Sequence, residues 1–229
     1  MVLINNPVIR PLVEFMLQTL KFFADFSSGN YGLAIILLTA LVKLALYPLT
    51  LQSLQQMAAM QRLQPKLQEL QKKFKSRPDE LQKRTIELYK SEKVNPLGGC
   101  LPMLLQMPFF LAVFGAVYSP EFKELLLSPG AQAGFLWIKD LAAPDLIPLM
   151  IFGRSLSLPI TAILIGLTSY WAQKTMPSAQ AQKGPLTYFF PVFIAYISIY
   201  FPAGAQIYWL AQTVLSIIQQ MYIGWRHIY

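Results

Sequence analysis

Charged residues, cysteine and histidine are all scarce in this chain. Charged side chains make up 13% of its 229 residues, whereas a soluble domain carries about 25%. The single cysteine, Cys100, excludes an internal disulfide and any metal site built from several cysteines. The single histidine, His227, stands close to the end of the chain and leaves little room for histidine-based catalysis. The scarcity of charge predicts an integral membrane protein, and a soluble enzyme is not expected.

The short motifs of catalysis and cofactor binding are absent as well. The sequence contains no Gly-x-Ser-x-Gly, no His-Glu-x-x-His, no Gly-Lys-Ser/Thr phosphate loop and no dinucleotide fingerprint. We therefore expect no enzyme activity, no cofactor and no metal. The net charge of +8 is typical of cytoplasmic loops in a membrane protein, and we expect no specific DNA binding.

Long apolar runs are abundant. A helix that crosses a membrane needs roughly 20 mostly apolar residues. Runs that approach this length predict five transmembrane helices, at residues 31–51, 97–118, 158–171, 186–200 and 205–225. An alternative start for the third run lies earlier within residues 145–171. The predicted fold class is all-α, a polytopic membrane protein that forms one domain over residues 1–229.

The basic residues orient these spans. Residues 52–95 hold ten Lys or Arg, whereas residues 119–157 hold three Lys or Arg and four acids. Because basic loops stay in the cytoplasm, we predict an N-terminus outside and a C-terminus in the cytoplasm. The first residues lack the pattern of a signal peptide. An outside N-terminus then requires either a short translocated tail or the removal of an upstream signal or span, and we favour removal.

Two segments outside the spans have helical patterns. Residues 7–26 carry polar residues at helical spacing, which predicts an amphipathic helix lying on the outer membrane surface: Arg10, Glu14, Gln18, Lys21 and Asp25. Residues 52–93 carry an apolar seam followed by a proline and two acids, which predicts a cytoplasmic helical hairpin. This hairpin is either a solvated linker folded on itself or a basic docking arm for ribosomal RNA or a targeting factor.

Lys43 is a charge inside the first predicted span. In a helix, Thr39, Lys43 and Tyr47 share one face because they are four residues apart. Polar residues of the other spans predict a hydrophilic cavity together with this face: Gln106, Thr161, Thr168, Ser169, Tyr208, Gln212, Ser216 and Gln219. Alternatively, the Lys43 side chain extends along its helix toward the cytoplasmic headgroups, which lie about 12 Å away at 1.5 Å per residue.

Several strings closely resemble the bacterial YidC insertases, which have chloroplast and mitochondrial relatives. They are YGLAIILLTALVKLALYPLT, MQRLQPKLQELQKKF, NPLGGCLPMLLQMP, FLWIKDL and YFPAGAQIYWLAQTVLSIIQQ. The resemblance implies a five-span core with a hydrophilic groove, open to the cytoplasm and to lipid and closed to the outside. By the same resemblance Lys43, Thr39 and Gln106 line this groove. Lys43 replaces the usual bacterial arginine, and residues 142–159 are longer than the family leads us to expect.

The resemblance implies a membrane-protein insertase and folding chaperone of the bacterial inner membrane. Its partners would be newly made membrane proteins and the lipid bilayer, with the Sec translocon and the ribosome as further partners. The substrate groove would comprise Lys43, Thr39, Gln106, Tyr47, Tyr208, Gln212 and Ser216. Two alternatives remain open: a small-solute transporter that uses Lys43 as a substrate or proton site, and a passive scaffold for assembling other membrane proteins.

Overall fold

The computed structural model describes residues 9–95, 101–151, 154–175 and 186–223. This part of the chain is mostly helical, which confirms the predicted class in outline. Its elements are α1 (Arg10–Phe26), α2 (Tyr31–Ala45), α3 (Tyr47–Lys73), α4 (Pro78–Ser91), α5 (Leu101–Tyr118), α6 (Pro120–Leu127), β1 (Ile147–Ile151), β2 (Arg154–Leu158), α7 (Ile160–Thr175), α8 (Leu186–Ser198) and α9 (Ala203–Ile223).

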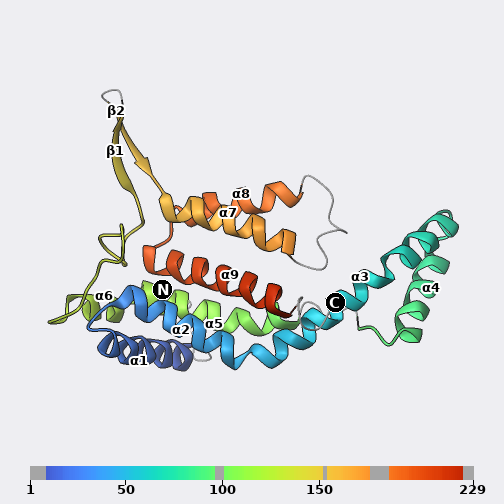
Figure 1. Ribbon diagram of the computed structural model, residues 1–229, viewed down its shortest axis with the longest axis horizontal. Coiled ribbons are helices and arrows are strands. Elements are labelled where there is room, and N and C mark those ends of the chain that lie inside the picture. The colour runs from blue at the N-terminus through green and yellow to red at the C-terminus, as the bar shows by residue number, and fades with distance from the viewer. Residues whose placement is uncertain (1–8, 96–100, 152–153, 176–185, 224–229) are drawn as a thin grey trace.

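Helices α1, α2, α5, α7, α8 and α9 form a bundle, and α3 and α4 form an arm that leaves it at one end (Figure 1). We call this end of the bundle the arm end and the opposite end the far end. Helix α2 packs against α1 and α9, α5 packs against α1, and α7 packs against α8 and α9. The main core lies among α1, α2, α5 and α9, and its fully buried side chains include Met16, Leu20, Ile35, Leu38, Val113 and Val117.

The first predicted span is divided between two helices. Helix α2 ends at Ala45, α3 begins at Tyr47, and the two are bent by 64°. Pro48 stands in the first turn of α3, where its missing N–H is tolerated, whereas it could not continue the hydrogen bonds of α2. Among the described residues no single helix is both long and apolar enough to cross a membrane. Helices α2 and α3 together have the length and composition for a crossing, as a bent pair.

A β-hairpin interrupts the all-α pattern that the sequence predicts. Strands β1 and β2 pair antiparallel, with Ile147 opposite Leu158 and Ile151 opposite Arg154. Helix α7 follows at Ile160, directly after a proline. The alternative of an earlier helical start for the third span is therefore wrong, because these residues form strands. The segments predicted at residues 97–118, 186–200 and 205–225 are helical where the chain is described, as α5, α8 and α9, with bounds that differ by a few residues.

Helix α1 turns one face to the core, and its predicted polar residues lie outside that face. Its buried residues are Val13, Met16, Leu20 and Ala24, which follow one another at three or four positions. Phe15, Phe22 and Phe26 of the same helix are exposed. The helix therefore has a core face, a polar face and an exposed aromatic edge, which is a suitable composition for a helix lying on a membrane surface.

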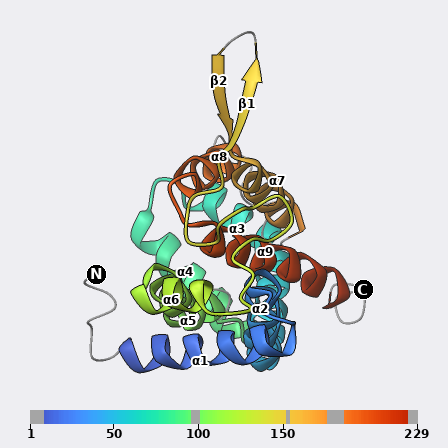
Figure 2. The ribbon, with the colours of Figure 1, turned by 90° about the vertical axis from the view of Figure 1, so that its left-hand side faces the viewer.

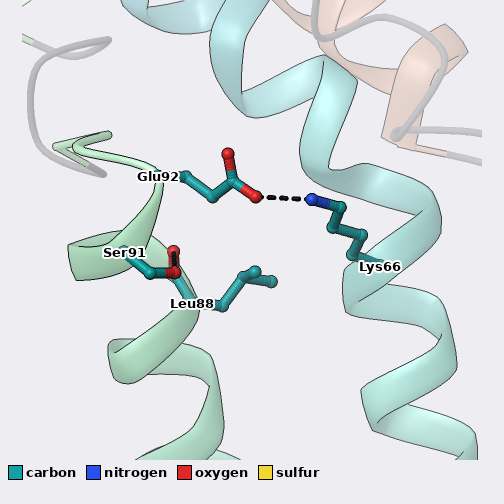
Figure 3. A network of polar contacts seen from close by, with 4 residues as sticks. All are labelled: Lys66, Leu88, Ser91 and Glu92. Carbon is teal, nitrogen blue, oxygen red and sulfur yellow. Dashed lines mark hydrogen bonds and ion pairs between the residues drawn. The ribbon is translucent and has the colours of Figure 1, made fainter.

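The arm is a helical hairpin, in which α4 returns alongside α3 (Figure 1). Lys66 of α3 forms an ion pair with Glu92, directly after α4 (Figure 3). Ser91 stabilises the end of α4, because its hydroxyl donates to the Leu88 carbonyl at 2.9 Å (Figure 3). The turn between the two helices ends at Pro78, where α4 begins. Asp79 and Glu80 stand in the first turn of α4, as the sequence predicts.

Candidate functional site

Lys43 lies in the last turn of α2, where the partial negative charge of a helix C-terminus favours a cation. Its Nζ donates a hydrogen bond to the Ser216 hydroxyl of α9 at 2.7 Å. That hydroxyl in turn donates its only proton to the Gln212 carbonyl at 2.8 Å, so its oxygen is the acceptor for Lys43. The ammonium is therefore bound to the neighbouring helix and does not extend along α2 toward the end of the bundle.

Within the described residues, the ammonium of Lys43 forms no ion pair. The ion pairs in this part of the chain join exposed groups on α1 and on the arm: Arg10–Glu14, Lys66–Glu92, Arg77–Glu80 and Arg84–Glu87. A cation within a bundle is costly unless it meets polar protein groups, water or a counter-charge. A single hydroxyl acceptor satisfies one of the three ammonium protons, so Lys43 can still accept an anionic or polar ligand.

Helix α9 presents a polar stripe beside Lys43. Tyr208, Gln212 and Ser216 are four residues apart and lie on one side of the helix. Several buried polar atoms on or next to this stripe make no hydrogen bond within the described residues: Gln106 Nε2, Tyr208 Oη, Gln212 Oε1 and Gln219 Nε2. A buried polar atom without a partner costs about 1–3 kcal/mol. We therefore expect water or the polar groups of a ligand to reach them.

Gln106 brings α5 into the same site. Its side chain lies beside the Tyr208 hydroxyl, although the two do not meet hydrogen-bond geometry. Tyr208 is 1% exposed and packs its ring against that of Phe110, with ring centroids 6.1 Å apart. The site is therefore formed by α2, α5 and α9, with the aromatic packing of α5 on α9 holding the polar groups in place.

Two predicted site residues do not join this cluster. Thr39 is completely buried, and its hydroxyl donates to the Ile35 carbonyl of its own helix at 2.6 Å. Tyr47 begins α3, beyond the bend, so the prediction that it shares a helix face with Thr39 and Lys43 is wrong. Thr168 likewise donates to a carbonyl of its own helix, that of Leu164.

The sequence pattern did not single out Asp145, a buried carboxylate at the far end of the bundle. Its Oδ2 accepts hydrogen bonds from the Thr161 amide at 2.9 Å, the Thr161 hydroxyl at 2.6 Å and the Trp137 indole N–H at 3.2 Å. Thr161 stands in the first turn of α7, where amide groups have no partner within the helix. No local signal marked this contact, because α7 begins fifteen positions after Asp145, at Ile160. Asp145 ties the segment after α6 to the start of α7.

Comparisons with known proteins agree with this fold. The family described as 60Kd inner membrane protein matches residues 22–227. The membrane protein insertase YidC of Citrifermentans bemidjiense is 39% identical over 221 residues, which are 96% of this chain and 37% of that protein. Its namesake in Geobacter sulfurreducens is 40% identical over 217 residues, 93% of this chain and 37% of that protein.

A solved structure extends the comparison to three dimensions. It is described as an active YidC insertase crystal structure with the first transmembrane domain resolved, and it matches with a TM-score of 0.63 and 23% identity. The match covers 92% of this chain and 45% of that one, and it supports the fold. The chain spans little more than a third of the length of the curated relatives it matches. Since the family match extends over almost all of the sequence, the chain belongs to the 60Kd inner membrane protein family.

Proposed function

We propose that this chain is a membrane-protein insertase and folding chaperone of the bacterial inner membrane. Relatives that match nearly the whole chain carry the name membrane protein insertase YidC. The observation that carries the proposal is Lys43, a cation inside the bundle with one hydroxyl partner and no ion pair in the described residues. It stands beside buried polar atoms that lack partners. Such a site suits a polar or acidic segment in transit.

In this proposal, the polar site is part of a hydrophilic groove that receives the extramembrane segment of a substrate from the cytoplasmic side. Lys43 attracts an acidic side chain, and the polar groups of α5 and α9 reduce the cost of removing that segment from water. At an effective dielectric constant of about 20, a carboxylate about 8 Å from the ammonium gains about 2 kcal/mol. This exceeds the 1.4 kcal/mol that corresponds to a tenfold change in occupancy.

The apolar helix of the substrate then moves into lipid. The proposed exit runs along α7 and α8, which expose large apolar side chains over much of their length: Ile163, Leu167, Trp171, Tyr188, Phe189, Phe190 and Val192. Burial of apolar surface in lipid supplies the free energy, so no nucleotide is needed. We propose the predicted topology, with the N-terminus outside and the arm in the cytoplasm. The basic arm would meet the ribosome, and the Sec translocon is a further proposed partner.

The test is insertion of a small single-span substrate with an acidic terminal segment into vesicles that contain the full chain. We expect Lys43→Arg to retain insertion, because the charge is kept. We expect Lys43→Glu to lower the insertion rate at least about tenfold, because attraction becomes repulsion. Lys21→Glu is the matched control, since it makes the same charge change on an exposed position of α1.

The outcomes separate the proposal from its alternatives. Normal insertion by Lys43→Glu would contradict charge attraction at this site. Solute flux into vesicles in the absence of any substrate protein would favour a transporter. Equal loss of insertion with Lys43→Glu and Lys21→Glu would point to a general effect of charge on the membrane surface rather than to the site between α2 and α9.

A further inference from the structure

A lysine and two stacked tyrosines form a cluster where α7 ends and α8 begins, at the arm end of the bundle (Figure 1). Lys174 stands in the last turn of α7 and is exposed. Its Nζ lies 4.5 Å from the ring centroid of Tyr170. The Tyr170 ring stacks on that of Tyr188 in α8, with centroids 5.9 Å apart. The ammonium is therefore kept near the junction of the two helices.

Lys174 forms no ion pair within the described residues, where the ion pairs lie on α1 and on the arm. From residue 146 to the end, the sequence contains no Asp or Glu. The contact with the Tyr170 ring uses one side of the ammonium, and an ammonium has three donors. Lys174 can therefore bind an anion as well, and this part of the sequence supplies none.

An exposed apolar stripe leads along α7 to this cation. Ile163, Leu167 and Trp171 are four residues apart, and all three are exposed. Because an α-helix turns by about 100° per residue, these side chains and that of Lys174 lie within an arc of about 100°. Figure 2 shows α7 and α8 together on the side of the bundle opposite α1. The stripe thus faces outward, away from the main core.

The length of the stripe matches one leaflet of a bilayer. Ile163 stands eleven residues before Lys174, which corresponds to about 16 Å along the helix. The hydrocarbon core is about 30 Å thick, so one leaflet spans about 15 Å. Trp171 lies near the cation, and tryptophan is enriched at the level of the headgroups. The order along α7 is therefore a site for an anion, an interfacial aromatic residue and then apolar surface, which is the order of the parts of a phospholipid.

We propose that α7 and α8 bind an anionic phospholipid at the arm end of the bundle. Its phosphate lies against Lys174, beside the two tyrosines, and one acyl chain lies along the stripe. The ligand is a lipid and not a soluble phosphate, because a soluble phosphate would leave the apolar stripe uncovered. This proposal rests on the proposed function, which puts these helices in the membrane with the arm in the cytoplasm. The lipid then belongs to the cytoplasmic leaflet, and a substrate helix that leaves along α7 and α8 replaces it.

The test measures the binding of single lipids to the full chain in detergent by native mass spectrometry. Phosphatidylglycerol and phosphatidylcholine with identical acyl chains are titrated separately. Lys174→Gln removes the charge, and Lys174→Arg retains it. Lys90→Gln is the matched control, because it removes the same charge from an exposed position of α4 on the arm. Leu167→Ser makes the stripe polar at an exposed position.

We expect Lys174→Gln to weaken the binding of phosphatidylglycerol about fivefold and to leave that of phosphatidylcholine unchanged. Lys174→Arg should bind both lipids as the original chain does. Leu167→Ser should weaken the binding of both lipids, because their acyl chains are the same. This pattern separates the contact with the headgroup from the contact with the acyl chain.

Two results would overturn the proposal. One is an equal effect of Lys174→Gln and Lys90→Gln on phosphatidylglycerol, which would make the cation at the end of α7 no more important than any other. The other is displacement of phosphatidylglycerol by an equimolar amount of glycerol phosphate, which would favour a soluble phosphate as the ligand. The measurement reports lipid binding and not insertion, so a chain without insertion activity would still give the expected pattern.

Discussion

Replacing Asp145 by alanine should loosen the far end of the bundle more than any other change to an acid in that region. The carboxylate is 4% exposed, and all three of its hydrogen bonds converge on Oδ2. Two of the donors belong to Thr161, which is itself completely buried. The third comes from Trp137, eight residues before the acid. One side chain thus joins the start of α7 to the segment after α6.

The expected loss follows from the groups left behind. The buried amide of Thr161 would lose its partner, at about 1–3 kcal/mol, and the half-buried Trp137 N–H would lose a net bond of about 0.5–1.5 kcal/mol. The negative charge near the N-terminus of α7 contributes about 0.3–1 kcal/mol more. The Thr161 hydroxyl can rotate to another acceptor and is not counted. Together these contributions predict a loss of about 2–5 kcal/mol.

Thermal unfolding of the full chain in detergent, followed by circular dichroism, measures this loss. For a chain of this size the expected fall in Tm is roughly 4–20 °C. Asp140→Ala is the matched control, because Asp140 also accepts a bond from a loop amide, that of Ala142 at 2.8 Å, but at an exposed position. Its loss should stay below about 1 kcal/mol.

Asp145→Asn separates charge from hydrogen bonding. Its carbonyl oxygen can occupy the position of Oδ2 and accept the same donors, but neutral acceptors are about half as strong as charged ones. An intermediate Tm is therefore expected. The free energies of unfolding of Asp145→Ala and of the original chain could differ by less than about 0.5 kcal/mol, as for ordinary surface substitutions. That result would show that the carboxylate does not hold α7 at this end.

Three further predictions concern other parts of the chain. Gly29→Ala should lower the free energy of unfolding by about 1–3 kcal/mol. The φ angle of Gly29 is +84°, and a Cβ at this position would lie 2.0 Å from the backbone oxygen of Gly130. The Tm of the variant in detergent measures this loss. Ser216→Ala should lower the free energy of unfolding by about 1.5–3 kcal/mol, because Lys43 loses its hydrogen-bond acceptor. Thr213→Ala should lower it little, because the Thr213 hydroxyl bonds within its own helix. Lys66→Gln should change Tm by less than the equivalent of about 1 kcal/mol, because the pair on the arm is exposed; a larger fall would mean that this pair orders the whole arm.

The sequence predicted the helices well where local signals agree with burial. The apolar run at residues 186–200 became α8, and the proline followed by two acids marked the start of α4. The bend at Leu46 was missed, because hydropathy summed over residues 31–51 does not register that Pro48 cannot continue α2. The strands were missed because a short apolar run has no period that separates strand from helix.

The candidate site was predictable in part. Spacing of four residues along α9 identified Gln212 and Ser216, and a charge in an apolar run identified Lys43. Which helix Lys43 would meet is a tertiary fact, since Ser216 stands 173 positions later. The hydroxyl of Thr39 bonds to its own backbone four residues before, and such a bond leaves no trace in the pattern of residue types.

The two ends of the bundle differ in how many hydrogen-bond partners their buried charges have, as Asp145 and Lys43 show. The far end holds a buried anion whose Oδ2 accepts three hydrogen bonds, one of them from the amide of Thr161 that opens α7. Nearer the arm, the bundle holds a cation with one acceptor, beside polar atoms that lack partners in the described residues. A satisfied charge fixes structure, whereas an under-coordinated one remains available to a ligand. The proposed entry of a substrate segment from the arm end agrees with this difference in coordination.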